Sequence, residues 1–113
     1  MAITNLNSNA ILAHRVTIAM TPASRMTGLL KHSSLPEGDA LVITGCQSIH
    51  MFFMKFAIDV VFVDGQNRVI GLCANIRPFH LSSIFWKSAC AIELPAGTIE
   101  KTGTKVGDVL QIK

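Results

Sequence analysis

The stretch that decides the fold is residues 58–76, which read IDVVFVDGQNRVIGLCANI. Two runs rich in Val, Ile and Phe are separated by a turn at 64–67 that begins Asp-Gly. Such runs are typical of strands, and an Asp-Gly turn between them is a strong local signal for a hairpin. The first run extends back to Ile49, so residues 49–63 are expected to hold two strands or one long bent strand.

Outward from this hairpin, short apolar segments alternate with turn residues such as Pro36, Gly38, Pro95 and Gly97. We expect about six to eight short strands, connected in sequence and therefore mostly antiparallel. Besides the hairpin, whose returning strand is 68–76, the strands are predicted at 13–19, 40–44, 88–94 and 109–112.

One definite helix is predicted at 22–32. Thr21 suits its N-cap, Pro22 suits its first position, and apolar residues recur at helical spacing from Met26 to Leu30. A helical turn is also expected at 98–102. Together these elements predict an α+β fold, with a mostly antiparallel sheet that is barrel-like or a sandwich and a helix packed on one opening.

Composition indicates one small domain covering residues 1–113, with half of the residues apolar and 15% charged. The net charge is +3, but no two Lys or Arg residues are adjacent, whereas nucleic-acid binders concentrate such residues in a patch. Nucleic acid is therefore not an expected partner. No apolar run approaches the roughly 20 residues that a membrane-spanning helix needs.

The N-terminal stretch 1–7 lacks the basic start and apolar run of a signal peptide, so we expect the chain in the cytoplasm. Cys46, Cys73 and Cys90 form no CxxC pair. An odd number of scattered cysteines fits free thiols in a reducing compartment.

Two carboxylates, those of Asp59 and Glu93, stand between large apolar neighbours. Burying either one unpaired would cost several kcal/mol. Each must therefore face solvent, accept hydrogen bonds from backbone donors, or pair with a cation. Arg25 on the predicted helix is the expected cation. Lys55 and His50 are the next candidates for this pairing.

Two interpretations of these residues stay open. The favoured one is a structural ion pair that ties the helix to the sheet. The alternative is functional: a ligand pocket at one end of the barrel, lined by Arg25, His50, Met54, Asp59 and Glu93. Acid–base catalysis would need a raised pKa and a cleft, and the sequence indicates neither. No catalytic residue and no cofactor is assigned.

Cys46 and His50 invite a metal or a Cys–His interpretation, but their spacing argues against it. Four residues span about 13 Å in an extended strand. A zinc site also needs at least three protein ligands. A packed Cys46 and a hydrogen-bonded His50 are expected instead, and no metal site is assigned.

Phe85 and Trp86 lie beside Lys87 in a loop rich in Ser. Two adjacent aromatic side chains in a loop either cover the core or form a contact surface for a partner. Both interpretations stay open.

Four blocks in this sequence resemble one known family. Arg25-x-x-Gly28-Leu29-Leu30 resembles the helical Arg-x-x-Gly-Leu signature of the domain-of-unknown-function 192 family. Residues 50–64 resemble its central aromatic–Met and Ile/Leu-Asp-x-x-Phe block, and residues 91–97 its Leu-Glu-Leu-Pro-Ala-Gly block. Gly107-Asp108 matches its closing turn, so the blocks cover most of the chain from about Ala13 to Gln111.

The sequence departs from the family pattern at Phe53, where many relatives have Trp, and at Phe56, where many have Asn. Many relatives also carry an export signal or lipoprotein leader, which the sequence given does not show. The resemblance implies a mixed α/β, barrel-like fold. It brings no agreed activity, cofactor or catalytic residue.

The first functional hypothesis is a non-catalytic accessory or binding module. It would present a small polar pocket near Arg25, Asp59 and Glu93, or an apolar partner surface around Phe85 and Trp86. Two alternatives stay open. One is a small hydrolase-like enzyme that uses a carboxylate with a histidine, and the other is a homodimeric structural protein whose apolar excess forms the interface.

Overall fold

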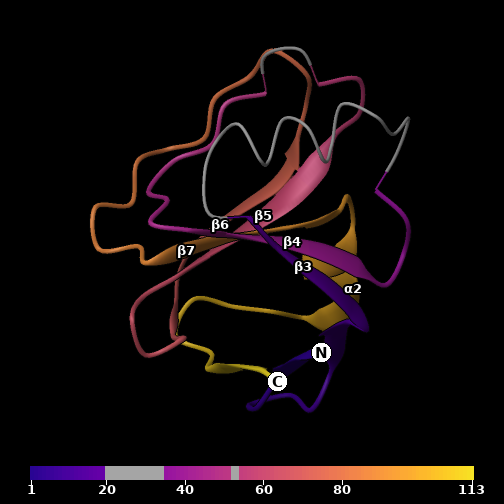
Figure 1. Ribbon diagram of the computed structural model, residues 1–113, viewed down its shortest axis with the longest axis vertical. Coiled ribbons are helices and arrows are strands. Elements are labelled where there is room, and N and C mark those ends of the chain that lie inside the picture. Colours follow the sequence, from indigo (N-terminus) through magenta and orange to yellow (C-terminus); the bar gives the residue numbers. More distant parts are fainter. Residues whose placement is uncertain (20–34, 52–53) are drawn as a thin grey trace.

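The computed structural model describes residues 1–19, 35–51 and 54–113 (Figure 1). Its largest element is a five-stranded sheet with the order β3-β4-β7-β5-β6. Neighbouring strands pair antiparallel except β3 and β4, which run parallel. The bounds are β3 (Arg15–Ala19), β4 (Asp39–Thr44), β7 (Cys90–Pro95), β5 (Ile58–Val63) and β6 (Val69–Ile76).

The predicted hairpin forms β5 and β6. Asp64 Oδ1 accepts hydrogen bonds from the backbone N–H groups of Gln66 and Arg68, at 2.9 and 3.0 Å. These two bonds hold the pKa of Asp64 below its ordinary value. Asn67 completes the turn with a φ of 60°, a left-handed conformation that Asn tolerates better than most residues. The side chain of Asp64 therefore sets the turn that joins the two strands.

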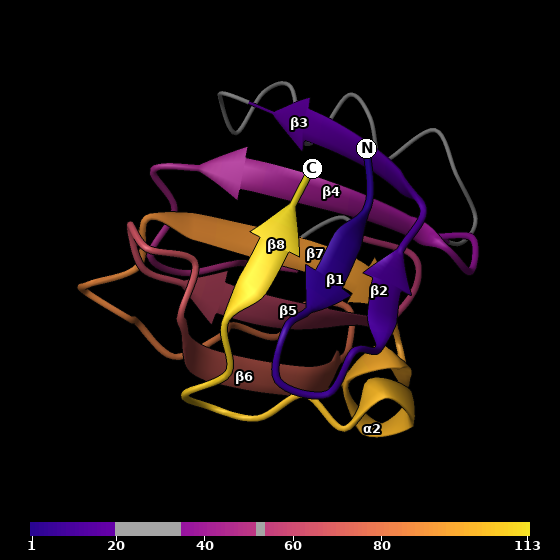
Figure 2. The ribbon, with the colours of Figure 1, turned by 90° about the horizontal axis from the view of Figure 1, so that it is seen from below.

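A three-stranded sheet covers one face of the larger sheet (Figure 2). Its order is β2 (Ile11–Ala13), β1 (Ile3–Asn5) and β8 (Leu110–Ile112), so the strands nearest the two ends of the chain pair with each other. Strands of this length are stable only when packed. The packing comes from a buried cluster shared by both sheets, which includes Ile3, Leu12, Leu110, Val61, Val63, Ile92 and Leu94.

The opposite face of the five-stranded sheet has a second core. Ile58, Val60 and Phe62 of β5 pack there with Met51 and Met54, which precede the strand. Successive side chains of a strand point to opposite faces, so every second residue of β5 belongs to each core. All of β5 is buried, because the strand lies between two neighbours and both of its faces are covered.

Helix α2 (Thr98–Thr102) follows β7 and confirms the helical turn predicted at 98–102. Gly97 and Gly103 flank it with φ values of 95° and 65°, which glycine adopts at little cost. No helix in the described part of the chain is long and apolar enough to cross a bilayer.

The prediction of a sheet-rich, mainly antiparallel α+β fold is confirmed, but the described strands do not close into a barrel. The two ends of the five-stranded sheet are β3 and β6, and β3 joins parallel to β4 instead of pairing with β6. The helix predicted at 22–32 lies outside the described residues. The sequence predicts that residues 49–63 form two strands or one long bent strand. Among the described residues of this stretch, the structure has β5 and an isolated bridge between His50 and Leu81.

The sequence pattern does not predict β1 or β2. Both segments have only three residues, and their sequences show too little alternation to be distinguished from loops. These strands form because they cover the first core, which only the folded chain brings together.

Candidate functional site

Asp59 accepts hydrogen bonds from the backbone rather than from a described cation. Its Oδ1 accepts the N–H of Asn75 at 2.8 Å, and its Oδ2 accepts those of Gly97 at 3.1 Å and Ile99 at 2.8 Å. The residue is only 1% exposed. Of the three ways to accommodate this carboxylate, backbone donors are the one observed. Asp59 thereby ties β5 to β6 and to the start of α2.

Glu93 lies on the other face of the sheet from Asp59. In the pairing of β5 with β7, Asp59 stands opposite Leu94 and Val60 stands opposite Glu93. Paired residues share a face, and Leu94 belongs to the first core whereas Val60 belongs to the second. The two carboxylates therefore point into different cores. They cannot act as one acid–base pair.

The five residues of the predicted pocket are not brought to one place by the described structure. Met54 is buried in the second core, on the face that also buries Glu93. His50 is exposed on a loop, and Asp59 lies on the opposite face of the sheet. Arg25 lies outside the described residues. Asp59 and Glu93 therefore do not line one pocket together, while the relation of Arg25 to these residues stays a prediction.

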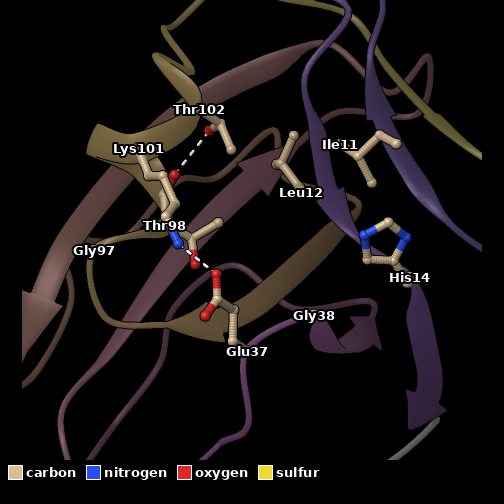
Figure 3. Close-up of a pocket in the computed structure, with 9 residues that line it drawn as sticks. All are labelled: Ile11, Leu12, His14, Glu37, Gly38, Gly97, Thr98, Lys101 and Thr102. Atoms are coloured by element: carbon tan, nitrogen blue, oxygen red, sulfur yellow. Dashed lines mark hydrogen bonds and ion pairs between the residues drawn. The ribbon is translucent and has the colours of Figure 1, made fainter.

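A cleft with a volume of about 150 Å³ lies between β2, the turn before β4 and α2 (Figure 3). Leu12 is buried in its wall, and Glu37, His14 and Thr98 stand around it. The sequence gives no signal for this cleft, because its lining comes from three segments that are distant along the chain. The lining residues are Ile11, Leu12, His14, Glu37, Gly38, Gly97, Thr98, Lys101 and Thr102.

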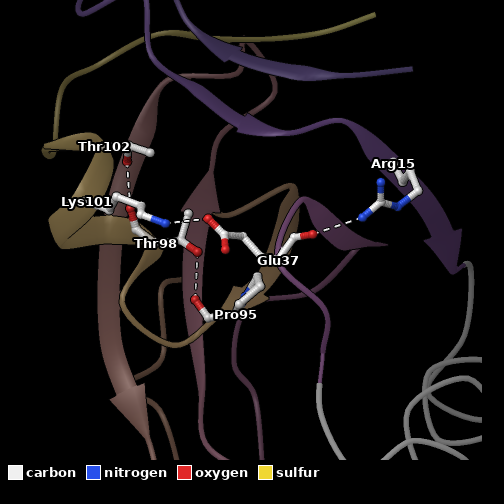
Figure 4. Close-up of polar contacts among 6 residues, drawn as sticks. All are labelled: Arg15, Glu37, Pro95, Thr98, Lys101 and Thr102. Carbon is white, nitrogen blue, oxygen red and sulfur yellow. Dashed lines mark hydrogen bonds and ion pairs between the residues drawn. The ribbon is translucent and has the colours of Figure 1, made fainter.

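Polar groups at the rim of this cleft mostly satisfy one another (Figure 4). Lys101 Nζ forms an ion pair with Glu37, and this contact holds the pKa of the Glu37 carboxyl below its ordinary value. The Thr98 hydroxyl donates to the Pro95 carbonyl at 2.7 Å, and the Thr102 hydroxyl donates to the Thr98 carbonyl at 2.8 Å. The lining is thus partly apolar, and the hydroxyl groups of Thr98 and Thr102 donate to backbone carbonyls rather than to a base that would activate them.

Residues 45–51 and 77–88 lie side by side and are called the loop pair below. In Figure 1 the segment after β6 runs along one side of the molecule before it enters β7. Backbone N–H groups donate across the pair from Met51 to His80, Phe79 to Met51, Ser82 to Ile49 and Phe85 to Gln47, at 2.9, 2.8, 2.9 and 2.8 Å. These bonds give a loop without regular strands a defined shape.

Phe85 and Trp86 have opposite environments, although both were predicted as one surface or one lid. The ring of Phe85 packs against the buried Phe62, and Gly71 makes room for it. A Cβ at Gly71 would lie 2.3 Å from Cε1 of Phe85. Trp86, by contrast, is 80% exposed.

Trp86 is one of four large apolar side chains that the loop pair exposes within eight consecutive residues. The other three are Phe79, Leu81 and Ile84, at 67%, 66% and 54% exposed. Phe79 also has a φ of 66°, which is a genuine outlier for a bulky residue and usually persists because its surroundings hold it there. These four residues are called the apolar strip below, and Trp86 is the one member that belongs to the predicted contact surface.

The described residues bring together no group of three or more His, Cys, Asp or Glu side chains that could hold a metal ion. All three cysteines are free thiols. Burial raises the pKa of the Cys73 and Cys90 thiols, which lowers the fraction of reactive thiolate at neutral pH.

The fold and these sites define a small α+β sheet protein with a core on each face of its main sheet. The model of the DUF192 family, described as "Uncharacterized ACR", matches residues 3–112. The chain therefore belongs to the DUF192 family, as the sequence blocks predict. That family is one of unknown function.

Relatives support this assignment. A UPF0127 protein of Thermococcus sibiricus is 30% identical over 108 residues, which are 92% of this chain and 70% of that protein. A UPF0127 protein of Pyrococcus furiosus is 33% identical over 64 residues, which are 57% of this chain and 54% of that protein. The crystal structure of a protein of unknown function from Novosphingobium aromaticivorans superposes with a TM-score of 0.81 at 20% identity, covering 98% of this chain and 82% of that one. Identity this low shows a shared fold and nothing more.

Proposed function

We propose that this protein is a non-catalytic binding module that docks a partner through the apolar strip Phe79, Leu81, Ile84 and Trp86. The observation that carries the proposal is the 80% exposure of Trp86 among three other exposed apolar side chains. Contiguous exposed apolar patches on soluble proteins mark interaction sites, and Trp is enriched among residues that dominate binding energy.

The packing and the hydrogen bonds of the loop support this function. Phe85 is packed against Phe62, and backbone hydrogen bonds tie the two members of the loop pair together. A surface that is already ordered loses less conformational entropy when it binds. The second core thus orders the loop that carries the strip before a partner binds.

The placement of the two carboxylates supports a non-catalytic role over the hydrolase alternative. Asp59 accepts three backbone N–H groups, and Glu93 faces the opposite core. A general base must reach a substrate proton, and Asp59 is only 1% exposed, with both of its oxygens already accepting backbone N–H groups. We also propose a cytoplasmic location, which the free thiols of the three cysteines favour.

The test is velocity sedimentation of a native extract from cells that produce the tagged protein. Wild type should sediment with material much larger than the 12.2 kDa chain. The triple variant Leu81→Ser, Ile84→Ser and Trp86→Ser should sediment as the free chain. Leu6→Ser removes another exposed apolar side chain, 50% exposed on the β1–β2 turn, and should behave as wild type.

Two results would count against the proposal. Identical sedimentation of the triple variant and wild type would show that the strip binds nothing. If purified wild type forms a dimer that the triple variant does not form, the strip would be an interface between two copies of this chain, and the homodimer alternative would replace the proposal.

A further inference from the structure

The loop pair carries no acidic side chain. No Asp or Glu occurs in residues 40–58 or 65–92, and the loop pair lies within these ranges. Three basic residues, Lys55, Arg77 and Lys87, are exposed on it or at its border. The remaining seven Lys and Arg of the chain balance its seven Asp and Glu. The loop pair and its border therefore carry basic side chains with no acidic side chain among them.

The fold gathers these basic residues although they are scattered in the sequence. Ile58 of β5 pairs with Ile76 of β6, so Lys55 and Arg77 flank the same end of the hairpin. Lys87 directly follows the exposed Trp86. Cationic side chains thus stand at both ends of the apolar strip.

We infer that the partner docked by the apolar strip is the anionic surface of a lipid bilayer, a claim that rests on the proposed function. Trp and Phe side chains favour the boundary between headgroups and acyl chains, where Leu and Ile can bury their apolar surface. Basic residues beside them are attracted to the negative surface potential of anionic lipids. The strip therefore combines both contributions to peripheral membrane binding.

The chemistry and shape of the strip favour lipid over other acidic partners. Single-stranded nucleic acid is held by stacking of bases on aromatic rings, and the aliphatic Leu81 and Ile84 offer no such face. An extended acidic peptide is usually held in a groove or at a sheet edge, so that alternate side chains enter pockets. Here the four side chains are more than half exposed along one loop.

Trp86 is the only tryptophan in the chain, so its fluorescence reports on this surface alone. The experiment titrates the full chain with vesicles of phosphatidylcholine, with or without phosphatidylserine. Vesicles that contain phosphatidylserine should shift the emission of Trp86 to shorter wavelength and carry the protein upward in a flotation gradient. Neutral vesicles should bind about tenfold more weakly or not at all, and added salt should release the protein.

Two variants separate the charged from the apolar contribution while keeping Trp86 as the probe. Arg77→Glu with Lys87→Glu should weaken binding to anionic vesicles by about tenfold or more. Leu81→Ser with Ile84→Ser should abolish the emission shift. Lys113→Glu, at an exposed residue next to the C-terminal strand, is the charge control and should weaken binding much less. Thermal unfolding of each variant verifies that these exposed substitutions leave the fold intact.

The outcomes distinguish this inference from the proposed function. One outcome is that wild type fails to bind anionic vesicles and still sediments with large material when the triple variant does not. In that case the lipid inference is overturned and the docking function stands. If both measurements fail, both proposals fall. Equal binding to neutral and anionic vesicles, or a shift of Trp86 emission by polyglutamate or single-stranded DNA but not by vesicles, would also overturn the lipid inference.

Discussion

The ring of Phe85 lies with its centroid 4.6 Å from that of Phe62, and the two planes are inclined by 35°. This contact attaches the loop that follows β6 to the second core of the main sheet. The next residue, Trp86, is 80% exposed. One aromatic side chain therefore anchors the loop, and its neighbour is presented to solvent.

Substitution of these two neighbours should have very different effects on stability. We expect Phe85→Ala to lower the free energy of unfolding by about 2–4 kcal/mol, because it removes a ring packed in the core. Trp86→Ala should change it by less than about 0.5 kcal/mol, because its surface is already in water. Urea unfolding followed by circular dichroism measures both values. Similar losses for the two variants would mean that Trp86 is packed as well.

Gly71 should tolerate no side chain while Phe85 holds its place. A Cβ there would lie 2.3 Å from the Phe85 ring, so Gly71→Ala should destabilise the protein by about 1–3 kcal/mol through overpacking. Gly65→Ala is the matched control, because a Cβ at Gly65 meets nothing within 4 Å. In a double-mutant cycle, Phe85→Ala should relieve most of the effect of Gly71→Ala. Additive losses would place the clash elsewhere.

Asp59→Asn should destabilise the fold by about 2–4 kcal/mol, because hydrogen bonds to a charged acceptor are strong and an amide cannot accept with both of its ends. The carboxylate holds the N–H groups of Asn75, Gly97 and Ile99, which belong to two different elements. Asp64→Asn is the control, since that half-buried carboxylate also accepts two backbone N–H groups. Equal stability of Asp59→Asn and wild type in urea would show that these bonds contribute little.

Asp108 should make stability depend on pH in the acidic range. Its carboxylate accepts hydrogen bonds from the Asn5 side chain and the Lys105 backbone, each at 2.9 Å, and these bonds lower its pKa. A lowered pKa means that the ionised form stabilises the fold above the ordinary pKa, and that this stabilisation is lost as pH falls through the lowered value. The difference in unfolding free energy between wild type and Asp108→Asn should therefore shrink below about pH 4. A difference that stays constant down to pH 2 would contradict this.

Local features were predictable from the sequence, and long-range ones were not. The hairpin at 58–76 is encoded by Asp64 and Gly65 between two apolar runs, and α2 by the glycines around 98–102. The parallel pairing of β3 with β4 depends on contacts between distant segments, so no local pattern indicates it. The same holds for the cleft beside α2, which three distant segments form.

The arrangement of the candidate site residues also depends on long-range contacts, so the sequence predicts only part of it. Asp59 and Glu93 were identified as carboxylates that need partners, but the register of β5 against β7 decides that they face different cores. Composition also cannot tell which of two adjacent aromatic residues turns inward. Gly71 leaves the space that the Phe85 ring fills, and it lies on β6 whereas Phe85 lies in the loop after that strand.

The most direct measurement of the central claim is a crosslinking scan in living cells. A photoreactive amino acid is placed in turn at Phe79, Leu81 and Ile84 of the apolar strip, and at Leu6 and Ile11, which are 50% and 51% exposed on the three-stranded side. The account predicts adducts at the three strip positions and none at the two control positions. Equal yields at all five positions, or adducts confined to the controls, would contradict docking through the loop pair.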